Sequence, residues 1–301
     1  MQLTDAIDQY FLACRVDNIS NKTISGYTYC LDNFIKVVGN RPIDEITPHH
    51  IREFMMNEMA RKHKRTGEPL SSQTRSKSYS VVRGFFNWLV TEELIEKSPT
   101  DRTNPPKVDY DLPDALTKEE LRRIFNYLEI ASPYRDKVIF EFFLDTGCRV
   151  AEVANLKLDD VHIKDGWAKV KGKGRKEGIV PLGKKLCYDL NLYINRYRRA
   201  PEDEPALFTS TRYPYSALTK DGLTSMVKRV HKAVGIKGKY GPHKLRHTMA
   251  TQFIANGGDI AILRRILRHT NINVTQRYIN LVQNDVQDAH RTHSPLDHLN
   301  D

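Results

Sequence analysis

Cysteine is scarce in this sequence. Four cysteines occur among 301 residues and none of them forms a C-x-x-C pair, so neither a zinc site nor a disulfide framework is predicted. We expect Cys14, Cys30, Cys148 and Cys187 to be buried thiols in a reducing compartment.

Long apolar runs are also missing. No stretch approaches the roughly 20 apolar residues that a membrane-spanning helix needs. The first residues, MQLTDAIDQYFLACRV, carry acidic side chains early and do not resemble a signal peptide. We therefore expect a cytoplasmic protein, associated with the nucleoid if it binds DNA, and no membrane partner.

Positive charge is what the chain has in excess. Its 47 Lys and Arg residues outnumber its 37 Asp and Glu residues, which gives a formal net charge of +10. A surplus of this size favours a polyanionic partner, most simply nucleic acid. A soluble basic protein without such a partner would have the same composition.

The first third of the chain has the apolar spacing of helices. Thr47 followed by Pro48 is typical of an N-cap with proline at the first helical position, and a longer helix is predicted over residues 72–95. The residues expected to face the core are Ile24, Tyr27, Leu31, Phe34, Ile35, Ile51, Phe54, Met55, Met59, Val82, Phe85, Phe86 and Leu89.

A basic run, RKHKRTGE, occupies residues 61–68. Such a run is usually a solvated surface, but in a basic protein it could contact phosphates. The basic residues that we predict to touch DNA there are Arg61, Lys62, Lys64 and Arg65.

Prolines crowd the chain near residue 105, where the apolar periodicity stops. A linker is therefore predicted, and Thr117 with Glu120 three residues later forms a capping box that opens the next helix. The predicted organisation is a helical domain at 1–102, a linker at 103–113 and a second domain at 114–301, which ends in a tail at 283–301.

The second domain is predicted to be mainly helical with one β interruption. Residues 161–182, VHIKDGWAKVKGKGRKEGIVPL, combine a turn at Asp165-Gly166 with alternating apolar residues, which indicates a small antiparallel sheet of two or three strands. The fold class is thus mainly α with a small antiparallel β-sheet. Further helices are expected around residues 184–198, 219–234, 242–256 and 259–268.

Two basic residues of this domain stand at positions suited to chemistry. Arg149 lies at a predicted helix start, where free N–H groups and the helix dipole favour anions, although a surface arginine is the simpler interpretation. Lys173 lies between glycines at the predicted hairpin tip, from which it could reach a scissile group, but basic turns are common.

Two further pieces contain histidines. His243 and Arg246 share one helical face, where an imidazole could move a proton and a guanidinium could bind phosphate oxygens, although H-x-x-R also occurs by chance. Tyr278 follows His269 in the same segment. A phenol has a free pKa near 10 and needs a base or strong positive charge to become a nucleophile, and a helical tyrosine more often packs.

Taken in chain order, these pieces resemble the motifs of the tyrosine recombinases, also called the phage-integrase family. TGCRVAEVANL is similar to the family's first-arginine motif, and VKGKGRKEGIVPL is similar to its β-hairpin lysine motif. HKLRHTMAT matches its H-x-x-R box, and LRHTNINVTQRY matches its final box, which ends in the nucleophilic tyrosine. The N-terminal helices resemble the family's core-binding, SAM-like domain. The likeness implies a Xer-like, two-domain member without an additional arm-type DNA-binding domain.

The resemblance implies a site-specific recombinase or integrase that needs no metal, cofactor or ATP. It would cleave and rejoin DNA through a 3′-phosphotyrosyl bond and a Holliday junction, which agrees with the absence of a G-x-x-x-x-G-K-[ST] loop. Tyr278 would attack the phosphate, Lys173 would protonate the leaving 5′ oxygen, and Arg149 with Arg246 would neutralise the transition state.

The remaining roles follow from the same resemblance. His243 would assist proton transfer, His269 would hydrogen-bond the phosphate, and Glu152 would brace the site from behind. Many relatives have glycine just before the second histidine, where this chain has Arg268; it could contact a phosphate or face solvent, and we favour solvent. Cys148, where small or apolar residues are common, is expected to pack.

The implied partners are double-stranded DNA with a specific recombination site, a homotetramer on synapsed DNA and, as an open question, a directionality factor. The tail would either exchange between subunits, dock on its own domain or fray. Two other functions remain open: a catalytically silent DNA-binding protein of the same fold, and a type IB topoisomerase. The other predicted DNA contacts are Lys171, Arg175, Lys176 and Arg268.

Overall fold

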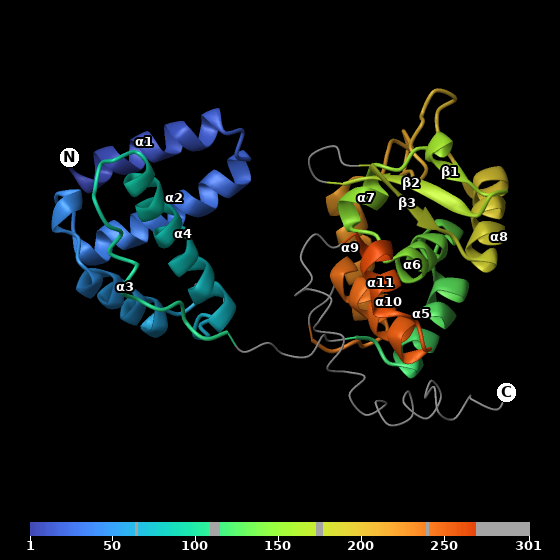
Figure 1. The fold of residues 1–301 in the computed structure, drawn as a ribbon. Coiled ribbons are helices and arrows are strands. Elements are labelled where there is room, and N and C mark those ends of the chain that lie inside the picture. The colour runs from blue at the N-terminus through green and yellow to red at the C-terminus, as the bar shows by residue number, and fades with distance from the viewer. Residues whose placement is uncertain (64–65, 109–114, 173–176, 239–240, 269–301) are drawn as a thin grey trace, which may run out of the picture. The chain divides into compact units, whose positions relative to one another are not determined.

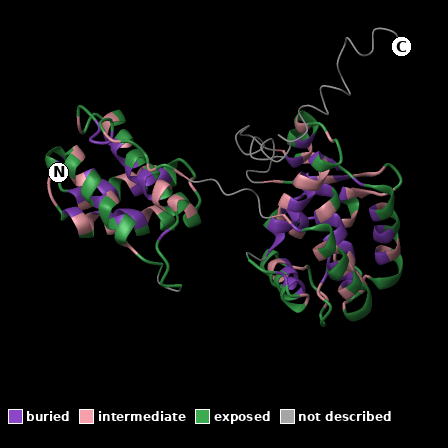
Figure 2. Ribbon diagram, turned by 90° about the horizontal axis from the view of Figure 1, so that it is seen from below, coloured by how far each residue is buried: buried purple, intermediate pink, exposed green. Residues whose placement is uncertain are grey.

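The computed structural model of the chain describes residues 1–63, 66–108, 115–172, 177–238 and 241–268. It divides into two compact units, Met1–Tyr110 and Asp111–Asp301, which we call unit 1 and unit 2. Each unit has a core of its own (Figure 2). No helix within the described residues is long and apolar enough to cross a membrane.

Unit 1 is built from helices that surround an aromatic core. The ring of Phe34 meets the rings of Phe54 and Phe86 edge to face, at centroid distances of 5.3 and 5.8 Å. The elements in Figure 1 are α1 (Leu3–Val16), α2 (Asn21–Val38), η1 (Ile43–Glu45), α3 (Pro48–Ala60) and α4 (Ser72–Thr91).

The predicted start and inner face of α3 are confirmed except at one residue. Thr47 caps the helix and Pro48 is its first residue. Met59, expected inside, is 54% exposed, whereas Glu58 is fully buried. The reason is periodicity: position 58 lies about two turns after the buried Ile51 and therefore on the same face, and position 59 is rotated away from it.

Unit 2 combines helices with a small sheet, as the sequence predicts. The helix α5 begins with the predicted capping box of Thr117 and Glu120. The elements are α5 (Lys118–Ala131), α6 (Tyr134–Thr146), α7 (Val150–Ala154), η2 (Leu158–Asp160), β1 (Val161–His162), β2 (Trp167–Lys171), β3 (Glu177–Pro181), α8 (Lys184–Leu192), the π-helical turn η4 (Tyr193–Tyr197), α9 (Lys220–Ala233), α10 (Pro242–Ala255) and α11 (Ile260–Leu267).

The sheet is antiparallel, with strand order β1-β2-β3. Val170 pairs with Gly178 and Ala168 pairs with Val180. Ala168, Val170 and Val180 are buried, so one face of the sheet joins the core of unit 2. Gly178 is the second residue of β3.

The helix α6 is the centre of unit 2. The helices α5, α8 and α10 pack against it. Most of its residues are therefore buried, as expected of a helix in the core of a domain. Cys148, just beyond its end, is 1% exposed, which confirms the predicted packing role. Cys187 is only partly buried, so the prediction of a buried thiol was wrong at that position.

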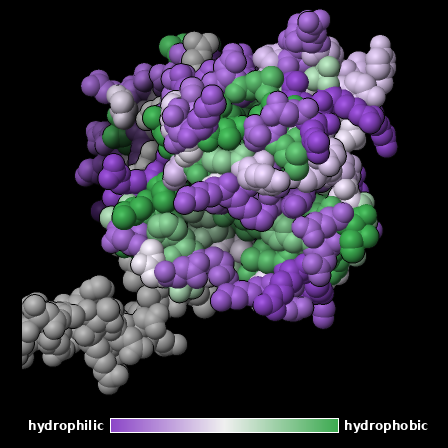
Figure 3. All heavy atoms as spheres, turned by 90° about the vertical axis from the view of Figure 1, so that its right-hand side faces the viewer, coloured by the Kyte–Doolittle hydropathy of each residue, from purple (hydrophilic) through white to green (hydrophobic). Residues whose placement is uncertain are grey.

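The surface of unit 2 is mixed in character. The face presented in Figure 3 carries many hydrophilic side chains with smaller hydrophobic areas between them. Exposed apolar residues are a normal part of a folded surface, so they do not by themselves mark a site.

Candidate active site

Arg149 lies at the junction between α6 and α7. The chain leaves α6 through Gly147, whose φ of +60° is the left-handed conformation that glycine adopts readily. A Cβ at Gly147 would stand 2.7 Å from Cδ2 of Leu267, so the close approach of α11 also requires glycine. Arg149 then takes the N-cap position of α7, as predicted. Because α7 has only five residues, its dipole contributes little.

Glu152 is a buried carboxylate that holds this junction. Its side chain is 2% exposed. One oxygen accepts the backbone N–H of Arg149 at 2.7 Å, and the other accepts Nη1 of the same arginine at 3.0 Å. The Arg149 side chain remains 42% exposed. The carboxylate therefore orients a guanidinium that still faces solvent. The role of Glu152 as a brace in catalysis stays a prediction.

Arg246 is the second arginine of the cluster and is buried in α10. Its Nη1 donates to the carbonyl of Gly147, and its Nη2 donates to the carbonyl of Leu267 at 2.6 Å. Both carbonyls lie at the C-terminal ends of helices, α6 and α11, where partial negative charge favours a cation. Burial, followed by the nearby charge of Arg149, lowers the pKa of Arg246 to about 10, so it stays protonated at neutral pH.

His243 stands one turn before Arg246, at the beginning of α10. Its pKa is lowered, first by partial loss of water around the ring and then by the positive charges of Arg246, Arg149 and Lys220. The imidazole is therefore neutral at physiological pH and able to accept a proton. Within α10, His243 and Arg246 are three residues apart and therefore share one helical face.

Arg268 corrects a prediction. The sequence favoured a solvent-facing side chain, but Arg268 is only 20% exposed and its Nη2 lies 2.7 Å from an oxygen of Glu152. A buried carboxylate attracts a cation strongly because water no longer screens it. Whether Arg268 also touches a phosphate stays a prediction.

The structure thus brings together Arg149, Glu152, His243, Arg246 and Arg268, which come from three separate places in the sequence. We call these five residues the arginine cluster. Three further predicted catalytic residues, Lys173, His269 and Tyr278, lie outside the described residues, as do the predicted DNA contacts Lys64, Arg65, Arg175 and Lys176.

The described DNA-contact candidates outside the cluster differ in their surroundings. Arg61 pairs with the buried Glu58 at 2.7 Å and lies over the ring of Tyr29, so it already has a structural role in unit 1. Lys62 is exposed. Lys171 is exposed near Glu177, at 4.0 Å. Their contacts with DNA stay predictions.

Sequence reasoning missed three residues that shape the cluster. Lys220 acts on the pKa of His243. The carbonyl of Gly147 binds Arg246, and Gly178 leaves the space that Arg268 occupies. The glycines were visible in the motifs, but only as a helix end and a hairpin residue. Their contacts join segments that are far apart in the chain, so no local pattern predicts them.

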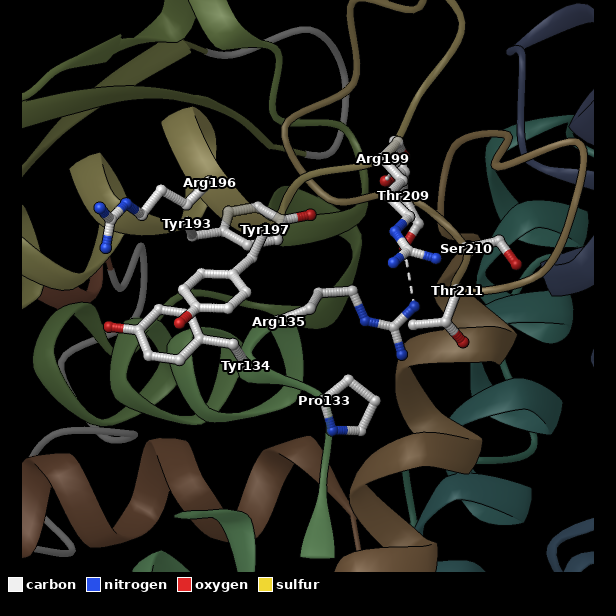
Figure 4. A pocket seen from close by; sticks show the side chains of 10 residues that line it. All are labelled: Pro133, Tyr134, Arg135, Tyr193, Arg196, Tyr197, Arg199, Thr209, Ser210 and Thr211. Atoms are coloured by element: carbon white, nitrogen blue, oxygen red, sulfur yellow. Dashed lines mark hydrogen bonds between the residues drawn. The ribbon is translucent and has the colours of Figure 1, made fainter. Parts of the chain in front are cut away.

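A separate cavity of about 290 Å³ lies elsewhere in unit 2, at the start of α6 (Figure 4). The rings of Tyr134 and Tyr197 stack at 4.4 Å, and Arg135 donates to the carbonyl of Thr209 at 2.7 Å. No member of the arginine cluster lines it. The cluster is therefore distinct from this hollow. Within the described residues, no group of three His, Cys, Asp or Glu side chains is placed to hold a metal ion.

Comparisons with known proteins identify the family of the chain. The model of the phage integrase family matches residues 114–285, and the model of the phage integrase N-terminal SAM-like domain matches residues 7–96. Tyrosine recombinase XerD of Oceanobacillus iheyensis is 29% identical over 96% of this chain and 98% of its own. Tyrosine recombinase XerC of Thermodesulfovibrio yellowstonii is 30% identical over 86% of this chain and 85% of its own.

The fold has a solved counterpart. A lambda integrase tetramer bound to a Holliday junction has a TM-score of 0.69 and 18% identity, over 90% of this chain and 78% of that chain. The chain belongs to the phage integrase family. Within that family it is a Xer-like tyrosine recombinase, an enzyme of site-specific DNA recombination.

Proposed function

We propose that the arginine cluster receives the scissile phosphate of a specific DNA site and that Tyr278 attacks it. The phenolic oxygen forms a bond to phosphorus while the bond from phosphorus to the 5′ oxygen breaks. The products are a 3′-phosphotyrosyl link and a free 5′-hydroxyl. Attack by a 5′-hydroxyl of the second duplex reverses these steps and leaves a Holliday junction.

One observation carries this proposal: Arg149 and Arg246 meet at the junction after α6, and protein groups orient each guanidinium. Arg149 binds the buried Glu152, and Arg246 binds the carbonyls of Gly147 and Leu267. A phosphodiester gains negative charge on its non-bridging oxygens as it becomes pentavalent. Preorganised donors at that position are typically worth roughly 3–4 kcal/mol each. The exposed face of Arg149 and the fully charged Arg246 suit that task.

The proton transfers are assigned to residues on either side of the phosphate. His243 would take the proton of Tyr278, because its lowered pKa leaves it unprotonated. Lys173 would give a proton to the leaving 5′ oxygen, and His269 would hydrogen-bond the phosphate. These roles rest on the motifs, since the three partners Lys173, His269 and Tyr278 lie outside the described residues.

DNA binding and assembly belong to the same proposal. Residues 1–102 and 114–301 would bind opposite sides of a duplex, with the linker at 103–113 crossing it. The lambda integrase of the comparison is a tetramer on a Holliday junction, and we propose that this chain also acts as a homotetramer on synapsed DNA. A directionality factor and a location in the nucleoid are further parts of the proposal.

A covalent-capture experiment tests the function. The protein is incubated with a pool of nicked duplexes that carry a randomised core, and adducts that survive denaturing electrophoresis are sequenced. We expect a covalent adduct, one preferred core sequence, and strand exchange between two such duplexes. Tyr278→Phe should form no adduct.

The two alternatives give other results. A silent DNA-binding protein would retain DNA in a gel-shift experiment and form no adduct. A type IB topoisomerase would form adducts without a preferred core and relax supercoiled DNA without exchanging strands. Either outcome would overturn the proposal.

A further inference from the structure

Arg268 occupies a backbone conformation that its residue type disfavours. It ends α11 with φ +52° and ψ +46°, in the left-handed region, which costs free energy for any residue with a Cβ. Glycine would adopt this conformation without that cost. A side chain that persists in such a conformation needs compensating contacts, and residues held in this way tend to occur at functional sites.

The contacts of Arg268 connect three elements of unit 2. Its Nη2 binds Glu152, at the beginning of α7, at 2.7 Å and lies 3.7 Å from Sγ of Cys148. Its aliphatic stem lies against β3, where a Cβ on Gly178 would come within 2.6 Å of the Arg268 Cδ. Its own residue joins α11 to the segment that begins with His269. One side chain therefore spans the ends of α7, β3 and α11.

The carboxylate of Glu152 is shared between two guanidinium groups. One of its oxygens accepts from both Arg268 and the backbone of Arg149, and the other accepts from the Arg149 side chain. With Arg268 present, three arginines of the cluster face one carboxylate, which leaves two positive charges. Without it, Glu152 would neutralise a larger part of the charge of Arg149, and only one positive charge would remain.

We infer that Arg268 is a positioning residue for strand cleavage that acts through Glu152. Its positive charge offsets that of the Glu152 carboxylate. Glu152 can then orient Arg149 without cancelling the positive charge with which Arg149 would bind the phosphate. It also fixes the distance between α7 and the C-terminal end of α11, whose last carbonyl binds Arg246. The inference rests on the proposed function and adds a residue to it that the family's usual glycine could not replace.

A double-mutant cycle tests this route of action. Single-turnover cleavage is measured at saturating concentrations of the duplex selected by covalent capture, for the wild type, Arg268→Ala, Glu152→Gln and the double variant. We expect Arg268→Ala to reduce the cleavage rate about 10-fold with little change in DNA affinity. In the Glu152→Gln background the same change should alter the rate less than about 2-fold, because the carboxylate charge is already gone.

A second variant reaches the same side chain from β3. Gly178→Ala places a methyl group where the Arg268 stem lies and should lower cleavage as much as Arg268→Ala does. The two changes together should be no worse than either alone. Arg264→Ala is the matched control, since it removes the same charge from the exposed face of the same helix.

Comparing the melting temperature with the cleavage rate separates a positioning role of Arg268 from a merely structural one. If Arg268 only stabilised the fold, the more stable variant would also cleave faster. Arg268→Gly removes the ion pair but also relieves the left-handed backbone, so its melting temperature should equal or exceed that of Arg268→Ala while cleavage stays equally slow. Arg268→Lys should recover part of the rate, because it restores the charge without the planar donors.

Each outcome decides the matter. If the wild type cleaves and Arg268→Ala loses the same factor in both backgrounds, Arg268 contacts the phosphate directly and the inference is wrong. If Arg268→Ala and Arg268→Gly cleave at the wild-type rate, the ion pair is only structural and the inference is also wrong. If the wild type forms no adduct, the proposed function itself fails, and this inference fails with it.

Discussion

The two units each contain a buried glutamate that binds arginine, and they use it differently. In unit 1, Glu58 binds Arg61 at 2.7 Å and accepts the hydroxyl of Ser78 at 2.7 Å, while Arg61 lies over Tyr29. In unit 2, Glu152 binds Arg149 and Arg268, and Arg149 remains 42% exposed against 24% for Arg61.

The difference lies in what surrounds the cation. Glu58 also binds Ser78 of α4, and Arg61 lies over Tyr29 of α2, so the pair connects α3 to α4 and α2. Glu152 instead binds Arg149, whose guanidinium side chain remains 42% exposed to solvent. A buried carboxylate can therefore either join helices or orient a cation for an external anion, and the exposure of its partner distinguishes the two uses.

The largest effect that distinguishes the two glutamates should appear in catalysis. We expect Glu152→Gln to slow single-turnover cleavage about 10²-fold, because Arg149 loses the charge that orients it. Glu58→Gln should change the rate less than about 3-fold. Equal losses in the two variants would mean that Glu152, like Glu58, only stabilises its unit.

The second-largest difference between the units is expected in the pH dependence of their stability. Burial lowers the pKa of His231, which is fully buried in unit 2, to about 4 from 6.5. The unfolded chain then binds a proton between these values that the folded chain does not. The contribution of the neutral His231 to the free energy of unfolding of unit 2 is therefore complete above pH 6.5. This contribution, about 3 kcal/mol, is lost as the pH falls toward 4.

The chain offers a separate probe for each unit. Its two tryptophans are Trp88 in unit 1 and Trp167 in unit 2, so Trp88→Phe leaves tryptophan fluorescence only in unit 2. Urea unfolding of that variant at pH 7, 5.5 and 4.5, with and without His231→Gln, measures the contribution. Parallel pH profiles with and without the histidine would contradict it.

A smaller effect is expected in unit 1. Glu58→Ala leaves the hydroxyl of Ser78 without its acceptor and Arg61 without its partner, which should reduce the free energy of unfolding of unit 1 by about 1–3 kcal/mol. Trp167→Phe as the background makes Trp88 the reporter. An equal loss in the Trp167 transition would show that the pair does not belong to unit 1 alone.

The smallest effect concerns the ring beneath Arg61. The guanidinium lies 5.4 Å from the centroid of Tyr29. Replacing this partly exposed tyrosine by leucine should cost about 0.5–1 kcal/mol, the usual value for an exposed cation–π contact. Tyr29→Phe retains the ring and should cost less. A loss as large as that of Glu58→Ala would mean that the ring, and not the carboxylate, fixes Arg61.

The sequence predicted those features that depend on neighbouring residues. The caps at Thr47 and Thr117 and the face of α4 with Phe85 and Phe86 follow from local hydrogen bonding and from helical periodicity. The prediction that Met59 faces the core was wrong, because it relied on hydrophobicity alone. The periodicity of α3 places Glu58 on the buried face instead.

The candidate site was predicted only as far as its motifs reach. Arg149, His243, Arg246 and the bracing Glu152 were identified from ordered motifs of a known family. The pairing of Arg268 with Glu152 was not, because it depends on the packing of α11 beside α7 and β3. Tertiary contacts of this kind become visible only when the chain is folded.

The anchoring of Arg246 has a consequence of its own. Two backbone carbonyls accept hydrogen bonds from its guanidinium, so no side-chain replacement can remove these acceptors. The position of this cation is instead tied to the ends of α6 and α11. A shift of either helix by about 1 Å would move the cation with it, and errors of that size can cost about 10²-fold in rate. Rigid packing of these two helices is thus itself a requirement for turnover.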